Sequence, residues 1–152
     1  MSYRVCVLLI AALSLWTSCG IQSFEDLADL NPPLALKATV VNGEIVLEFL
    51  SYNYEKNFSG FNVFIGTDSS HVRSQSKVIP NIRTDSVPTF AMLTNFARPT
   101  EVTLVISREY QSYEPLQSMN VMFWIGVSAY DAVYRQNSKC TDPQLVDMRL
   151  PP

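Results

Sequence analysis

The chain has 152 residues, of which 47% are hydrophobic and 16% charged, and its mean hydropathy is +0.09. These values predict one globular domain with a modest surplus of apolar residues. The formal net charge of -3 arises from 14 acidic and 11 basic residues, and the basic residues are scattered. A chain without a cluster of basic residues lacks the positive surface that binds the phosphates of nucleic acid.

The N-terminus has the pattern of a signal peptide. Arg4 precedes a run of twelve mostly apolar residues, 5–16. This run falls within the roughly 7 to 15 residues of a signal-peptide core and is too short to span the hydrocarbon of a bilayer. We therefore expect residues 1–18 to direct export, so that the protein does not stay in the cytoplasm.

The end of this segment carries a small residue followed by a cysteine, in the run Trp16-Thr17-Ser18-Cys19-Gly20. The run resembles the cleavage box of bacterial lipoproteins. Leu15 stands one place further from the cysteine than in the usual box, and looser boxes of this kind resemble those of spirochaetes. The resemblance implies that Cys19 becomes the acylated first residue, and that its acyl chains hold the protein at a membrane without spanning it.

The residue after Cys19 bears on the location of the protein. It is Gly20 and not Asp, which resembles the pattern that permits transfer to the outer membrane. The resemblance therefore implies the bacterial cell envelope, with the outer membrane favoured over the inner one. Two alternatives stay open, which are an ordinary signal peptide with Cys19 as a chance thiol and an uncleaved hydrophobic anchor.

Residues 19–31 are expected to form a lipidated tether. Phe24, Leu27 and Leu30 have a spacing that would suit one or two turns of helix. Asn31 precedes Pro32-Pro33, however, and the residue before a proline is disfavoured in a helix. We expect the tether to end at this rigid doublet.

After the proline doublet, alternating patterns predict strands separated by turns. Residues 34–41 form the first predicted strand, and Asn42-Gly43 is the strongest short hairpin signal. The second strand covers residues 44–50, and the residues expected to face inward are Ile45, Leu47 and Phe49.

The next part of the chain is less regular. We predict a loop over residues 51–59 and a third strand over 60–66 with Phe61, Val63 and Ile65 facing inward. Residues 67–99 contain a polar run and few clear patterns, whereas residues 101–108 form a strand rich in β-branched residues.

The most apolar predicted strand covers residues 121–131. It is apolar on both faces, which predicts a central position in a sheet, and its inward residues are Phe123, Ile125, Val127 and Ala129. A loop over 132–137 and a last strand over 139–150 follow. Pro143 cannot donate a ladder hydrogen bond, so this last strand lies at an edge or is broken there.

About seven short antiparallel strands, no long helix and one central apolar strand predict an all-β fold, a β-sandwich. Further residues of the pattern are Pro32-Pro33, Asn42-Gly43, Ile45-x-Leu47-x-Phe49, Gly60-Phe61-x-Val63 and Phe123-x-Ile125-x-Val127-x-Ala129-Tyr130-Asp131.

These motifs resemble those of a fibronectin type III domain, which is an immunoglobulin-like sandwich. The resemblance covers about residues 32–66 and 116–150, and it implies one domain over 32–152 with an extended middle region, 67–115. The chain departs from the family at two positions, because Phe49 stands for the usual Trp and Phe123 for the Tyr that closes a corner.

Few residues are candidates for chemistry. The run Asp68-Ser69-Ser70-His71 has the residue types of a hydrolase triad, but four neighbours in a polar run seldom converge, so we expect a solvated loop. With His71 as the one histidine and Cys140 as the one mature cysteine besides Cys19, the usual ligands cannot complete a zinc site. Acidic residues at calcium-loop spacing are absent. We therefore predict no catalytic residue, no cofactor and no metal.

Cys140 is open to two interpretations, which are a small core or edge residue and an intermolecular disulfide.

The aromatic residues are more informative. Tyr52, Tyr54 and Phe58 lie in the loop after the second strand and Tyr134 lies in the loop before the last, and in a sandwich of this type the two loops share one end. Tyr suits binding loops because it offers a large area at a small entropic cost. These residues are predicted either to cap the core or to form a ligand surface.

Three functional hypotheses follow. The first is a lipid-anchored binding or assembly module of the envelope, held at the membrane by Cys19 and open to a protein partner. The second is an envelope enzyme whose site lies in residues 67–115, and the third is a purely structural spacer. The small number of titratable candidates favours the first hypothesis over an enzyme.

Overall fold

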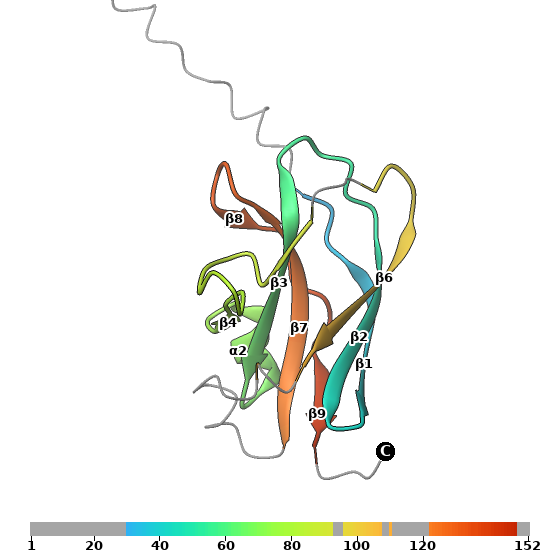
Figure 1. The fold of residues 1–152 in the computed structure, drawn as a ribbon, viewed down its shortest axis with the longest axis vertical. Coiled ribbons are helices and arrows are strands. Elements are labelled where there is room, and N and C mark those ends of the chain that lie inside the picture. The colour runs from blue at the N-terminus through green and yellow to red at the C-terminus, as the bar shows by residue number, and fades with distance from the viewer. Residues whose placement is uncertain (1–29, 93–95, 108–109, 111–121, 149–152) are drawn as a thin grey trace, which may run out of the picture.

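The computed structural model describes residues 30–92, 96–107, 110 and 122–148 (Figure 1). The predicted signal peptide, Cys19 and residues 20–29 of the predicted tether lie outside the described residues. The same holds for residues 93–95, 108–109 and 111–115 of the region 67–115.

The described chain forms two antiparallel sheets (Figure 1). The first sheet has three strands in the order β1-β2-β6, with β1 at Leu34–Val41, β2 at Glu44–Ser51 and β6 at Thr100–Ile106. The second sheet has six strands on the path β4-β3-β7-β8, with β5 beside β3 and β9 beside β7. Its strands are β3 (Phe58–Gly66), β4 (Val78–Ile79), β5 (Phe90–Ala91), β7 (Met122–Asp131), β8 (Gln136–Asn137) and β9 (Gln144–Asp147).

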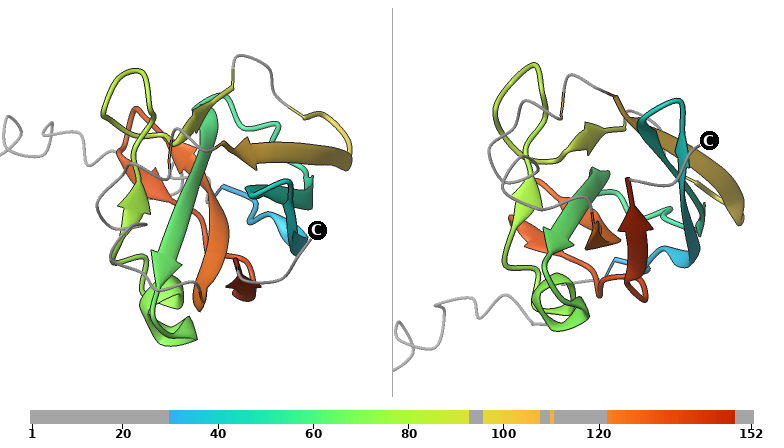
Figure 2. Two further views of the ribbon diagram at one scale, coloured as in Figure 1. Left: turned by 60° about the horizontal axis from the view of Figure 1, so that its bottom comes forward. Right: turned by 90° about the horizontal axis from the view of Figure 1, so that it is seen from below.

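The described helix α2 (Ser69–Arg73) has five residues, so the prediction of an all-β, antiparallel fold is confirmed. The two views of Figure 2 place β1, β2 and β6 on one side of the molecule, with β3 and α2 on the other. Phe49 of β2 and Phe61 of β3 join the two sheets through an edge-to-face contact with ring centroids 4.9 Å apart. The inner faces of both sheets therefore contribute to one apolar core.

The turn between β1 and β2 is the predicted hairpin. Val41 pairs with Glu44, and Asn42 and Gly43 between them have φ angles of 52° and 76°. A two-residue type I′ turn needs positive φ at both central positions, which Asn and Gly adopt readily. The inward residues predicted for β2 are at most 3% exposed.

The strand β7 is central, as predicted. It pairs with β3 along one edge and with β8 and β9 along the other, and its four inward residues are at most 3% exposed. Its second face is covered as well, because a Cβ placed on Gly126 would lie 2.6 Å from Val72 of α2 and 2.7 Å from Cys140. This cover explains why the strand is apolar on both faces.

The irregular stretch after β3 is more ordered than its sequence indicates. It contains α2, β4 and β5, and Thr89 ties it to β3. The Val63 amide donates to Thr89 Oγ1 at 3.0 Å, and the Thr89 amide donates to Asn62 Oδ1 at 3.1 Å. Side-chain hydrogen bonds of this kind replace a regular ladder, so the hydrophobic pattern gave no signal for them.

The C-terminal part differs from the prediction. Among the described residues of the predicted strand 139–150, only β9 is a strand, and it starts directly after Pro143, where a break was one of the two expectations. The predicted loop over 132–137 contains β8. Between these strands, the hydroxyls of Ser138 and Thr141 accept hydrogen bonds from the amides of Ala129 and Val127 at 2.9 and 3.0 Å. Hydroxyl groups therefore replace backbone acceptors beside β7, and the regular ladder is interrupted there.

Candidate functional site

Tyr52 and Tyr54 form an exposed aromatic pair directly after β2. Their ring centroids lie 5.3 Å apart, and the two residues are 43% and 58% exposed. They continue the period-two alternation of the strand, so both rings stay on the face opposite to the core. The structure therefore brings these two predicted site residues together.

A buried polar network lies beneath this pair. Ser51 Oγ donates to Asn53 Oδ1 at 2.8 Å, and Asn53 Nδ2 donates to Asn31 O at 2.8 Å and to Glu55 Oε2 at 3.3 Å. Asn53 is fully buried and Glu55 is 9% exposed. Buried polar groups with their partners in place hold a loop rigidly. The alternation of polar and aromatic residues over 51–55 was the signal in the sequence for this network, which sequence analysis missed.

Phe58 does not belong to the exposed surface, and of its two predicted roles, core contact and ligand contact, the structure supports the first. It is the first residue of β3, is 6% exposed, and packs edge-to-face against Phe61 and Phe96 at 5.1 and 5.9 Å between ring centroids. The β2–β3 connection is shorter than predicted because the ring of Phe58 is drawn into the core.

Tyr134 lies in the turn that follows β7 and is 47% exposed. Asp131 Oδ1 accepts hydrogen bonds from the amides of Val133 and Tyr134 at 2.8 and 3.0 Å, which shapes the turn. The turn shares an end of the domain with the β2–β3 loop, because Phe58 pairs with Asp131.

We call this end of the domain the Asn31 end. It consists of residues 52–57, 96–99 and 132–135, and Asn31 is bonded to it through Asn53. Residues 96–99 belong here because the Phe96 amide donates to Asn53 O at 2.7 Å. Tyr52, Tyr54 and Tyr134 therefore all lie at the Asn31 end. The rings of Tyr52 and Tyr54 contact each other.

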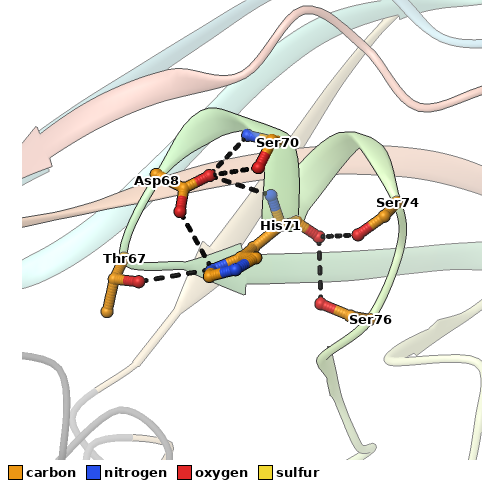
Figure 3. A network of polar contacts seen from close by, with 6 residues as sticks. All are labelled: Thr67, Asp68, Ser70, His71, Ser74 and Ser76. Atoms are coloured by element: carbon orange, nitrogen blue, oxygen red, sulfur yellow. Dashed lines mark hydrogen bonds and ion pairs between the residues drawn. The ribbon is translucent and has the colours of Figure 1, made fainter.

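Asp68 and His71 meet at the N-terminus of α2 (Figure 3). Asp68 Oδ1 accepts from the amide and the hydroxyl of Ser70 at 2.8 and 2.5 Å and from the His71 amide at 3.2 Å. The hydrogen bond from the Ser70 hydroxyl, followed by that from the His71 amide, lowers the pKa of Asp68 below its usual 3.8.

The arrangement around Asp68 caps a helix rather than activating a nucleophile. In a triad the imidazole stands between the hydroxyl and the carboxylate. Here the Ser70 hydroxyl donates to the carboxylate of Asp68, and His71 Nδ1 lies 3.2 Å from the other oxygen of that carboxylate. The predicted solvated loop is therefore an exposed, capped helical turn.

Cys140 is a half-buried thiol beside a shallow groove of about 350 Å³. The groove lies between residues 32–36 and residues 139–144. Burial raises the pKa of Cys140 to about 11. Since the thiolate is the reactive form of cysteine, this thiol is unreactive near neutral pH.

Among the described residues, no group of three His, Cys, Asp or Glu side chains is placed to hold a metal ion. Within the same residues, no helix has the length and apolar character that crossing a membrane requires.

No protein-family model matches the chain, and no curated protein matches it. Among solved structures, the chain is similar to the spore cortex lytic enzyme SleM of Clostridium perfringens, at 16% identity and a TM-score of 0.40. The match covers 84% of this chain and 31% of that enzyme, so the chain spans less than a third of its length. A similarity of this size supports no conclusion about activity.

Proposed function

We propose that the protein is a lipid-anchored protein of the bacterial envelope and acts there as a binding or assembly module. In this proposal residues 1–18 are the signal peptide and Cys19 carries the acyl chains. Gly20 after Cys19 supports the outer membrane over the inner one. The folded domain over 32–152 then presents the Asn31 end as its ligand surface.

The fold proposed for this domain is an immunoglobulin-like sandwich of the fibronectin type III kind. In immunoglobulin-like sandwiches the strands A, B and E share one sheet, and C, F and G share the other. The division of β1, β2 and β6 from β3, β7 and β9 corresponds to that arrangement and supports the proposal. The region 67–115 is the extension that distinguishes this chain from a minimal domain.

The main support for a binding role is that Tyr52 and Tyr54 are exposed on a rigid backbone. The residues that alternate with them, Ser51, Asn53 and Glu55, are at most 9% exposed and hydrogen-bonded. Aromatic side chains on a fixed backbone lose little conformational entropy when they bind. A purely structural spacer has no need of such a surface.

The alternative of an envelope enzyme is less well supported. The acid and imidazole that meet in the described part of region 67–115, Asp68 and His71, are about half exposed. Their hydrogen bonds serve the start of α2. Catalytic acids and bases are more often placed in clefts where burial shifts their pKa values.

The anchor is tested by metabolic labelling with palmitate. Cys19→Ser should abolish the label and move the protein from the membrane fraction to the aqueous fraction, because the acyl chains supply the attachment. Cys140→Ser is the matched control and should keep both the label and the membrane fraction. If the unlabelled Cys19→Ser variant stayed in the membrane fraction, the lipoprotein proposal would be contradicted.

The binding role is tested by photo-crosslinking in cells. A photoreactive phenylalanine analogue at position 54 should form defined adducts with its ligand, and the same analogue at position 41 is the control. Val41 is 46% exposed and precedes the hairpin turn at the opposite end of the domain. Adduct patterns that are identical at the two positions would favour the spacer.

A further inference from the structure

We propose that the Asn31 end of the domain lies against the lipid surface that anchors the protein, with Tyr52, Tyr54, Val133 and Tyr134 in the headgroup region. This inference rests on the proposed acylation of Cys19. It adds the identity of the ligand, which is the membrane itself.

The first argument is where the chain enters the domain. Leu30 is 4% exposed and belongs to the core, and Asn31 donates two hydrogen bonds to Glu55 Oε1. The polypeptide therefore joins the domain at the Asn31 end, and residues 20–29 alone separate Cys19 from Leu30.

The second argument is the reach of this connection. Whatever its conformation, the connection from Cys19 to Leu30 cannot exceed its fully extended length of about 38 Å. The strand β7 runs from one end of the domain to the other, and its ten residues span about 33 Å. The Asn31 end is thus the end held close to the bilayer, while the hairpin at Asn42-Gly43 is held away from it.

The third argument is the chemistry of the side chains exposed at this end. Val133 and Tyr134 are 67% and 47% exposed at the tip of the turn after β7, and Tyr52 and Tyr54 are exposed beside β2. Tyr is enriched at the membrane interface, because its ring is apolar and its hydroxyl remains hydrated. An apolar side chain between such rings adds to the affinity for lipid.

The charges at the Asn31 end are compatible with this contact. Lys56, Arg98 and Arg135 are exposed there. Glu55 in these segments and Asp131, which directly precedes residues 132–135, are 9% and 2% exposed and accept hydrogen bonds from the chain. The exposed charges on these segments are therefore cationic, which suits phosphate groups of lipids.

The tether offsets this charge. Glu25, Asp26 and Asp29 lie in the residues between Cys19 and Leu30, and three carboxylates balance three cations. The contact therefore depends on the aromatic and apolar side chains, and we expect it on neutral as well as on anionic bilayers.

The test uses the full-length, acylated protein reconstituted into phosphatidylcholine vesicles that contain brominated lipids, which quench tryptophan at the membrane. Three variants are made in a Trp124→Phe background, each with one new tryptophan. Tyr54→Trp and Val133→Trp place it in two different loops of the Asn31 end. Val41→Trp places it at the opposite end as the matched control. Mass spectrometry of each preparation reports the lipid on Cys19 and the loss of Trp16 with the signal peptide.

We expect Tyr54→Trp and Val133→Trp to lose fluorescence in brominated vesicles relative to plain vesicles, and Val41→Trp to keep it. Two probes are used so that the result does not depend on the folding of one variant. Unquenched probes at both positions on a protein whose Cys19 carries lipid would overturn the membrane contact and leave the lipid anchor standing. Equal quenching at all three positions would also overturn it. A Cys19 without lipid would overturn the anchor as well, and mass spectrometry identifies that case separately.

Discussion

Asn31 and Glu55 are joined by two hydrogen bonds to a single carboxylate oxygen, since the amide and the side-chain nitrogen of Asn31 lie 2.9 and 2.7 Å from Glu55 Oε1. The two residues are 24 positions apart. Their contact determines where the N-terminal chain enters the domain, and it lies in the same network that supports the exposed Tyr52–Tyr54 pair.

The first prediction concerns this network. Glu55→Ala should lower the free energy of unfolding by about 1–3 kcal/mol, because donors of Asn31 and of the buried Asn53 lose their acceptor. Urea unfolding measures the change. Lys56→Ala alters the adjacent exposed residue and should stay within about 0.5 kcal/mol of the wild type. Equal midpoints for the two variants would contradict the role given to the carboxylate.

The second prediction concerns the central strand. Val127 is fully buried on the inner face of β7, so Val127→Asp should cost several kcal/mol and unfold a domain of ordinary stability. Val105→Asp is the matched control, because Val105 is 40% exposed on β6. Thermal unfolding followed by circular dichroism should show a folded control and no cooperative transition for Val127→Asp. A cooperative transition of Val127→Asp near the wild-type temperature would refute the assignment of this face.

The third prediction separates the aromatic residues of the β2–β3 connection. Phe58→Ala should destabilise the domain by about 3–5 kcal/mol, because its ring is buried against two other rings. Tyr54→Ala should change stability by no more than about 0.5 kcal/mol, as expected of an exposed side chain. Denaturant titrations of the two variants provide the measurement. A Tyr54→Ala variant as unstable as Phe58→Ala would mean that the tyrosine caps the core.

The fourth prediction concerns Cys140. Burial raises its pKa to about 11 in the folded protein, while an unfolded thiol titrates near 8.5. The contribution of this group to stability is complete below about pH 8.5 and is lost as the pH rises toward 11. Alkylation by iodoacetamide at pH 8 should therefore be slow in the native protein and fast in urea. Equal rates in the two states would show that the thiol is not protected.

The fifth prediction concerns the cap of α2. The hydroxyl of Ser70 is the largest cause of the lowered pKa of Asp68, so Ser70→Ala should move that pKa up toward 3.8 without reaching it, because the His71 amide still donates. Because the folded pKa is depressed, the stabilising effect of the carboxylate is present above its ordinary pKa and fades as the pH falls through the folded value. NMR titration of the Asp68 carboxyl carbon measures both values. An unchanged pKa in Ser70→Ala would exclude the hydroxyl as the cause.

Local patterns in the sequence determined much of the fold. The alternation in residues 34–50, the Asn42-Gly43 turn and the doubly apolar strand at 121–131 all specified structure through near neighbours, because strand periodicity and a type I′ turn depend on adjacent residues. The antiparallel all-β class and the inward residues of β2, β3 and β7 followed from these patterns alone. The signal-peptide pattern and Cys19 are properties of the sequence, and the described structure does not bear on them.

Only the tertiary structure decided which aromatic residues are exposed and what lies beneath them. Phe58 and Tyr54 stand four positions apart in one polar and aromatic stretch, yet one packs into the core and the other is 58% exposed. The burial of Phe58 depends on its contact with Phe96, and the rigidity of the loop depends on Asn31. Both contacts join residues distant in the sequence. The alternation over residues 51–55 indicates that Asn53 is buried but not which groups it bonds, and Thr89 stands in no periodic pattern, so only the tertiary structure decided their hydrogen-bond partners.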